Sequence, residues 1–116
     1  MKSRKRDIAS VWDMVRAIQY AQNFTEGFTF DEYVNDLRTV SAVERQLEIL
    51  GEATSRISEE FREAHPSIDW RRIVGLRNVV IHRYDDVDQG IVWNIVQSDL
   101  TPLLDQLNAL LSSLPD

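Results

Sequence analysis

The sequence contains no cysteine, which excludes disulfide bonds and thiolate metal sites and fits a reducing compartment such as the cytoplasm. No apolar run approaches the ~20 residues of a membrane helix, and the basic first residues are not followed by an apolar signal core. We therefore expect a cytoplasmic protein that is not bound to a membrane. Only four glycines and three prolines occur in 116 residues, so little interrupts regular structure.

Basic residues are also in the minority. Thirteen lysines and arginines face nineteen acids, and the net charge of −6 argues against a protein that coats nucleic acid through its overall charge. The exception inside the chain is residues 69–84, where four arginines and one acid give a local net charge of +3. Asp85, Asp86 and Asp88 follow at once. They are typical of a helix start, because acids complement the positive end of a helix dipole, and they lack the glycine and terminal glutamate of a calcium loop.

The length allows one domain, residues 1–116, and the spacing of its apolar residues predicts helices throughout. Steps of three and four predict a first helix over about residues 7–24, and Thr29 with Glu32 forms a capping-box pattern for a second. The next stretch, interrupted near residues 36–41, carries a heptad-like apolar stripe: Val40, Val43, Leu47, Leu50, Thr54, Ile57 and Phe61. Ser58 is expected to cap a short separate turn.

The second half of the chain predicts two further helices. Asp69 should cap a helix over residues 70–82, and either Asp86 or Asp88 should start the last one. The apolar stripe of this last helix consists of Val96, Leu100, Leu103, Leu107, Leu110 and Leu114. Pro102 should kink or restart it, with Thr101 as the cap. The whole pattern predicts an all-α, antiparallel bundle of four to five helices, and a bundle of this size often forms a homodimer.

The stretch "RNVVIHRY", residues 77–84, places five polar residues around an apolar run. Arg77 can hold a phosphate through two parallel hydrogen bonds, and His82 can move a proton near neutral pH without a metal. On a helix, Asn78 and His82 share a face, whereas Arg77 lies ~140° from His82. The two side chains converge only if His82 lies at a frayed helix end or a neighbouring helix steers them. A hydrogen-bonded structural pair remains the plainer alternative.

Other polar residues have simpler interpretations. Glu44, Glu48 and Glu52 form a like-charged row that needs a basic partner, for which Arg77 and Arg83 are candidates and Arg45 and Arg56 local alternatives. Gly51 weakens its helix by about 1 kcal/mol relative to alanine, which predicts the close approach of another helix there. His65 is expected in a solvated turn. The tryptophans, at 12, 70 and 93, are expected in the core or in dimer contacts.

The stretch 77–84 has the form R-x4-H-x-Y and resembles the motif of HepT-like proteins in the HEPN superfamily. Two longer segments share the resemblance, "AVERQLEILGEA" (42–53) and "IDWRRIVGLRNVVIHRYDDVDQGIVW" (68–93). The resemblance implies a helical bundle that dimerises so that two motifs face one cleft. It also implies a metal-independent endoribonuclease without a cofactor, the toxin of a toxin–antitoxin pair. The antitoxin would be a minimal nucleotidyltransferase that transfers AMP to the motif tyrosine, in a complex that could be a larger hetero-oligomer.

Carried over by position, the resemblance makes Arg77 and His82 the catalytic residues that act on RNA, and Asn78 would orient one of them. Glu52 would brace Arg77, and Tyr84 would accept the AMP. Arg83, where relatives often have a small residue, either adds a phosphate contact or crowds Tyr84. Two other hypotheses stay open. One is a non-catalytic module that docks a nucleotidyltransferase or a nucleotide, and the other is a structural dimerisation bundle with Arg77 buried against Glu52.

Overall fold

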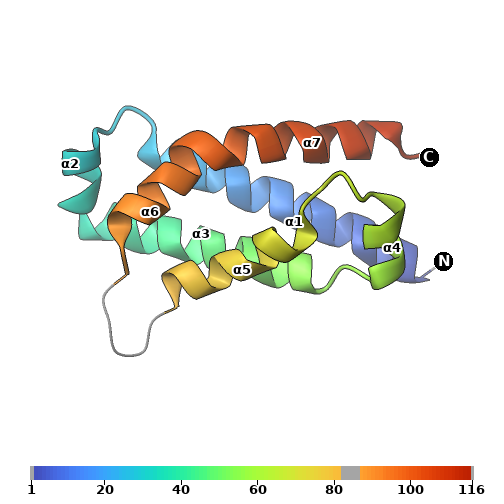
Figure 1. Cartoon of the computed structure of the whole chain (residues 1–116). Coiled ribbons are helices and arrows are strands. Elements are labelled where there is room, and N and C mark those ends of the chain that lie inside the picture. Colours follow the sequence, from blue (N-terminus) through green and yellow to red (C-terminus); the bar gives the residue numbers. More distant parts are fainter. Residues whose placement is uncertain (1, 82–86, 116) are drawn as a thin grey trace.

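The computed structural model describes residues 2–81 and 87–115, and every regular element within these ranges is a helix. His82, Arg83, Tyr84, Asp85 and Asp86 lie outside the described residues. The long segments are α1 (Lys2–Thr25), α3 (Leu37–Ser55), α5 (Trp70–Val80) and the run α6 (Gln89–Asn94), η1 (Ile95–Asp99) and α7 (Leu100–Ser113). They run antiparallel in turn, with the short helices α2 (Phe30–Val34) and α4 (Glu59–Ala64) at opposite ends (Figure 1). The predicted all-α bundle is confirmed.

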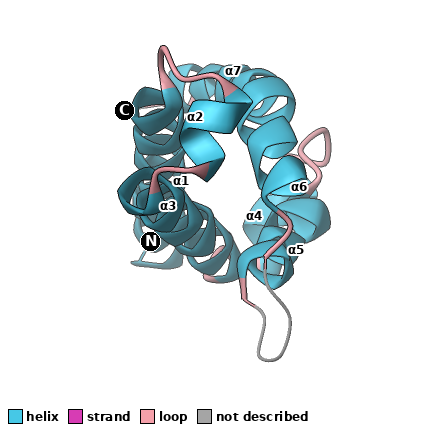
Figure 2. Ribbon diagram, turned by 90° about the vertical axis from the view of Figure 1, so that its left-hand side faces the viewer, coloured by secondary structure: helices cyan, strands magenta, loops and turns pink. Residues whose placement is uncertain are grey.

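The core lies between these segments, and the two predicted apolar stripes supply much of it. Every residue of the first stripe is buried; in the second, Leu103 and Leu114 are only partly buried. In the view along the bundle, α2 lies across the near end (Figure 2). There Tyr33 is fully buried and packs its ring against Trp93 at a centroid distance of 5.2 Å. The apolar pattern therefore placed the inner faces of the long helices correctly.

The first helix begins at Lys2, earlier than the predicted start at about residue 7. Asp7 therefore lies inside α1, where its side chain is 3% exposed. Its carboxylate accepts hydrogen bonds from the backbone N–H and the hydroxyl of Ser58, at 2.8 and 2.7 Å. Ser58 caps α4, as predicted, by accepting a bond from the N–H of Phe61. Asp7 thus joins α1 to the start of α4, a tertiary role that its position in the sequence does not indicate.

Helix starts follow the predicted capping chemistry. Thr29 and Glu32 form a complete capping box for α2, and the break in the second stretch falls immediately before α3, which Asp36 caps. Asp69 accepts a bond from the N–H of Arg72 at the start of α5. Of the two alternatives for the last helix, Asp88 is the cap, through the N–H of Ile91.

Pro102 does not restart the last helix. It lies in the first turn of α7, and the turn before it, η1, is a π-helix in which the N–H of Leu100 bonds to the carbonyl of Ile95. A proline removes one backbone donor, and the wider turn accommodates that loss while the chain stays helical. The predicted cap at Thr101 is wrong, because its hydroxyl instead accepts a bond from the side-chain amide of Gln22 at 3.0 Å.

One expectation for a single residue also needs correction, and the tryptophans divide between buried and exposed positions. His65 ends α4 and is half-buried, because its ring packs on Phe61 at a centroid distance of 4.7 Å; it is not fully solvated. Trp70 is buried and Trp93 partly buried, as expected of core residues. Trp12 is 50% exposed on α1, so it is not a core residue, and its expected alternative role in dimer contacts stays a prediction. For His65, packing on the buried ring of Phe61 outweighs the solvent exposure that its polar turn suggests.

Candidate functional site

Arg77 occupies the last turn of α5, directly over Gly51 of α3. A Cβ added to Gly51 would overlap Cγ of Arg77 and lie only 3.3 Å from the carbonyl oxygen of Val74. The close helix approach predicted from Gly51 is therefore confirmed, and its cause is the Arg77 side chain. Only glycine leaves room for the stem of this arginine to cross α3, so the pair fixes where the guanidinium lies.

The guanidinium is not fully paired by residues 2–81 and 87–115. Its Nε is buried and has no hydrogen-bond partner among the described residues. A buried polar group without a partner costs ~1–3 kcal/mol, so most proteins avoid it except where the group has a functional role. Arg77 is thus held in a defined place at an energetic cost, as expected of a group that binds something other than the described part of the chain.

The predicted partner of Arg77 is Glu52. It is half-buried on α3, but no ion pair joins it to Arg77 within 4 Å among residues 2–81 and 87–115. Elsewhere in the glutamate row, Glu48 pairs with Arg45 at 2.6 Å. Arg56, the other local alternative, pairs with Asp13 of α1 at 3.5 Å. The described residues therefore give no support to the interpretation in which Arg77 is buried against Glu52, and the predicted role of Glu52 stays a prediction.

The remaining motif residues lie at or beyond the end of α5. The helix ends at Val80, two residues before the predicted end, and Ile81 has an extended backbone with φ −108° and ψ 99°. The helical face that Asn78 and His82 were predicted to share therefore ends before His82. Asn78 itself is exposed in the last turn. His82, Arg83 and Tyr84 lie outside the described residues, so their predicted roles stay predictions.

A partly buried chain of hydrogen bonds fixes the helix that follows the motif. The hydroxyl of Tyr33 donates to the side-chain oxygen of Gln89, and the side-chain nitrogen of Gln89 donates to Glu44, each at 2.5 Å. Burial, and next the charge of Glu44, raise the pKa of Tyr33 far above its ordinary value. The chain thus ties together α2, α3 and the first residue of α6. Glu44 was noted only as part of a like-charged row, and no sequence signal pointed to Gln89.

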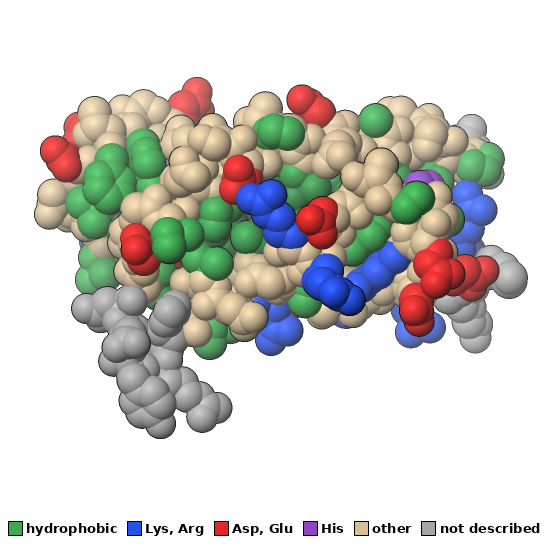
Figure 3. Space-filling model, viewed as in Figure 1, with side chains coloured by type: hydrophobic (Ala, Val, Ile, Leu, Met, Phe, Trp, Pro, Cys, Tyr) green, Lys and Arg blue, Asp and Glu red, His purple; other side chains and the backbone are tan. Residues whose placement is uncertain are grey.

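An apolar groove runs beside Arg77's helix, between α5 and the α6–η1 segment. Its volume is about 770 Å³, and its apolar lining consists of Leu76, Val79, Ile91 and Ile95. Ile91 is 50% exposed and Ile81, just past the end of α5, is 48% exposed. Hydrophobic side chains gather over α6 and its approach to α5 in the space-filling view (Figure 3). Exposed apolar surface of this kind commonly marks a protein interface.

The described residues hold no group of three or more potential metal ligands. Within the same ranges, no helix is long and apolar enough to cross a membrane.

Comparison with known proteins identifies the family. The family model described as "Ribonuclease HepT-like" matches residues 14–110, most of the chain. The chain belongs to the HepT-like ribonuclease family of HEPN proteins. A protein of Thermococcus cleftensis named "Probable ribonuclease HepT" is 37% identical over 91 residues, which cover 78% of this chain and 83% of that protein. No solved structure matches significantly.

Two proteins of Methanocaldococcus jannaschii named "Putative RNase" are also similar. One is 38% identical over 97 residues, covering 83% of this chain and 89% of the relative. The other is 30% identical over 113 residues, covering 97% of each chain. The family model begins at residue 14, inside α1, and the 30% match covers nearly the whole chain, so the similarity extends well beyond the motif segment.

Proposed function

We propose that this HepT-like chain is a metal-independent endoribonuclease and the toxin of a toxin–antitoxin pair. Membership of a ribonuclease family supports the activity. The observation that carries the proposal is Arg77, whose stem crosses α3 at Gly51 and whose Nε has no partner among the described residues. A rigidly placed guanidinium with donors to spare suits a phosphodiester.

The proposed reaction is an internal phosphoryl transfer. The 2′-oxygen attacks the adjacent phosphorus while the bond to the 5′-oxygen of the next nucleotide breaks, giving a cyclic phosphate and a free 5′-hydroxyl. Arg77 binds the phosphate and stabilises its developing charge. His82 takes the proton from the 2′-hydroxyl or gives one to the leaving oxygen, with Asn78 orienting one of these groups. Arg83 is a candidate second contact to the phosphate.

A homodimer would divide the two proton transfers between two copies of His82. The groove between α5 and α6, with Ile81 and Ile91 exposed beside it, supports this interface. It lies next to the helix that carries Arg77, so a second copy docked there would place the two copies of α5 near each other. Two basic segments would then reinforce each other's field within an acidic protein.

We further propose that a minimal nucleotidyltransferase is the antitoxin and that it silences the toxin by transferring AMP to Tyr84. The added phosphate would place negative charge beside Arg77 and compete with RNA for it. The partners could assemble into a larger hetero-oligomer. The resemblance of residues 77–84 to the family motif supports this step.

A second candidate is a non-catalytic module that keeps this fold to dock a nucleotidyltransferase. The net charge of −6 favours it, because a strongly acidic surface opposes RNA binding. The test is growth after induced expression of the wild type and of His82→Ala, each with and without a nucleotidyltransferase encoded beside it. Arrest that His82→Ala abolishes and the partner relieves, with an AMP-sized mass added at Tyr84, is the expected result.

Normal growth for both proteins, with a stable partner complex that survives Arg77→Ala and no added mass, would support the docking module instead.

A further inference from the structure

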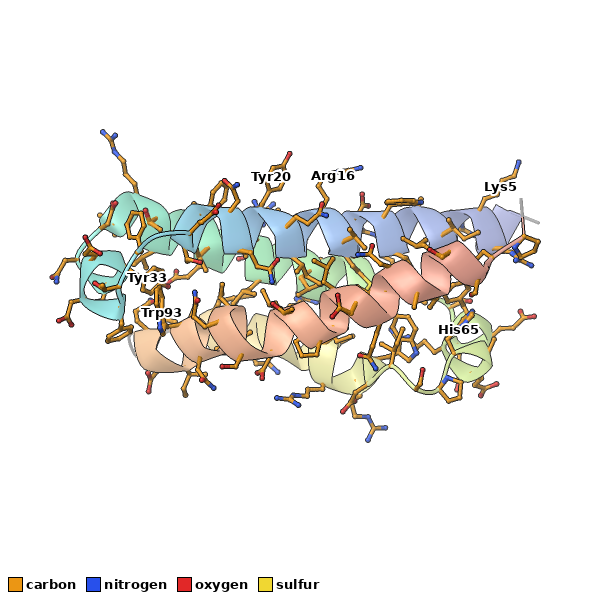
Figure 4. The ribbon with its side chains drawn as sticks, turned by 90° about the horizontal axis from the view of Figure 1, so that it is seen from above. Lys5, Arg16, Tyr20, Tyr33, His65 and Trp93 are labelled. Carbon is orange, nitrogen blue, oxygen red and sulfur yellow. The ribbon has the colours of Figure 1, made fainter. Side chains whose placement is uncertain are left out.

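One face of α1 combines aromatic and basic side chains in a way that the core does not require. Trp12 is 50% exposed and Tyr20 is 48% exposed, with Arg16 midway between them. Together with exposed Lys5 they lie within ~80° of one another around the helix axis. We call these four residues the α1 ridge. Figure 4 shows Lys5, Arg16 and Tyr20 projecting from α1 on the side away from α7.

We propose that the α1 ridge binds single-stranded RNA outside the cleavage site, an inference that rests on the proposed ribonuclease function. Trp12 and Tyr20 are eight residues apart, ~12 Å along the helix, with Arg16 at the midpoint. Aromatic faces separated by a cation follow the alternation of base and phosphate along an extended strand. The ring of Tyr20 is already placed, because it stacks on Phe24 with centroids 5.9 Å apart and planes 11° from parallel.

The charge of α1 favours a polyanion over other occupants. Residues 4–20 contain four basic and two acidic residues in a chain of net charge −6. Of the two acids, Asp7 is buried on Ser58, and Asp13 forms only surface pairs with Arg16 and Arg56. Surface pairs of this kind are worth ~0–1 kcal/mol, so a phosphate can replace Asp13 as the partner of Arg16.

A protein partner fits this face less well. Over residues 9–20, the other exposed positions on this face are Arg16 and Gln19, between the two aromatic residues, and Ala9, one turn before Trp12. The ridge therefore lacks the contiguous apolar centre of a protein interface. The groove between α5 and α6 has such a centre. The chain thus presents two chemically different surfaces: an apolar one beside Arg77 and an aromatic and basic one on α1.

The ridge and the cleavage site lie on opposite sides of the bundle. Helix α1 packs on α3 and α7, whereas α5 packs on α3 and α6, and α5 lies at the far edge from the ridge in Figure 4. The two shorter dimensions of the molecule are 31 and 20 Å. At the ~3.4 Å spacing of a fully stacked strand, as in B-form DNA, these dimensions correspond to roughly six to nine nucleotides. Long substrates would therefore reach the ridge and very short ones would not.

The test is the Kd of fluorescein-labelled oligouridine, 20 or 4 nucleotides long, measured by anisotropy with the full chain in a His82→Ala background. Trp12→Ala combined with Tyr20→Ala should weaken binding of the 20-mer by about tenfold or more, and leave binding of the 4-mer unchanged. Arg16→Gln should also weaken binding of the 20-mer. Trp12→Phe, which keeps an aromatic ring in place of the alanine, should bind the 20-mer as the unsubstituted ridge does. The matched controls are Phe30→Ala, an exposed aromatic residue on α2, and Arg38→Gln, an exposed arginine on α3.

Equal Kd values for ridge variants and controls in the His82→Ala background, when the wild type binds and cleaves RNA, would overturn this inference alone. A wild type that neither binds nor cleaves RNA would overturn the proposed function with it. Loss of a protein complex in the ridge variants, with RNA binding unchanged, would assign the ridge to a protein partner and also overturn the inference.

Discussion

At the scale of single residues, the central pair is Arg77 and Gly51. The sequence indicated both: Arg77 through the motif, and Gly51 through its cost to a helix that otherwise has good propensity. What the sequence did not indicate is that one is the reason for the other. That relation depends on how α5 crosses α3, which is a property of the packed bundle and not of either segment. Glu52 was assigned to Arg77 for the same lack of tertiary information.

The contact between Gly51 and Arg77 predicts that a side chain at position 51 impairs cleavage. Gly51→Ala should lower RNA cleavage by on the order of 10- to 100-fold, because its Cβ displaces the stem of Arg77 and so moves the guanidinium. In an Arg77→Ala background the overlap is gone, and Gly51→Ala should instead stabilise the protein by up to ~1 kcal/mol through helix propensity. Thermal unfolding of the four proteins of this double-mutant cycle, together with cleavage rates for the two that keep Arg77, is the measurement. The same stability change from Gly51→Ala in both backgrounds would contradict the contact.

At the scale of helices, capping residues and apolar stripes predicted most starts and inner faces. Three of the predicted boundaries differ from the structure. α1 extends back to Lys2 although basic residues oppose the dipole at a helix start, and α5 stops at Val80. Pro102 follows a π-helical turn that accommodates its missing backbone donor, and the sequence does not specify such a turn.

The chain of hydrogen bonds from Tyr33 through Gln89 to Glu44 predicts a pH effect on how α2, α3 and α6 hold together. The pKa of Tyr33 is raised in the folded state, so folding favours the neutral hydroxyl. This contribution is complete below the unfolded-state pKa of about 10 and is lost as pH rises above it. The melting temperature of the wild type should therefore fall more steeply than that of Tyr33→Phe between about pH 9 and 11.5.

The matched control is Tyr20→Phe, which removes a half-exposed hydroxyl. Its melting curves should fall as steeply with pH as those of the wild type. Parallel curves for all three proteins would show that folding does not raise the pKa of Tyr33.

At the scale of the whole molecule, the sequence predicted the all-α bundle because periodic helices with short connections have few other ways to bury their apolar faces. The sequence did not reveal that α1 carries an exposed aromatic and basic face and α6 an exposed apolar one. Exposure on these helices depends on which neighbours cover them. The exposed area is 7442 Å², and a stable interface takes ~800 Å² from each partner, about a tenth of it. In the proposed homodimer, the face that carries Ile91 and Ile81 would supply the apolar part of such an interface.

The proposed homodimer predicts that Ile91→Asp yields a monomer in sedimentation analysis, because a charge cannot be buried unpaired in the groove between α5 and α6. Cleavage should be lost with the dimer while the melting curve stays cooperative. Leu37→Asp is the control, since Leu37 is 78% exposed on another part of the bundle. A dimer that persists in Ile91→Asp and dissociates in Leu37→Asp would place the interface elsewhere.

The account as a whole depends on one measurement: cleavage of RNA by the purified chain in excess EDTA, for the wild type, Arg77→Ala and His82→Ala, with analysis of the product ends. We predict cleavage by the wild type that leaves a cyclic phosphate and a 5′-hydroxyl. Both variants should lose it by at least about 100-fold, because each removes a group that acts in the transition state. Cleavage that EDTA abolishes, or that survives both substitutions, would contradict the account.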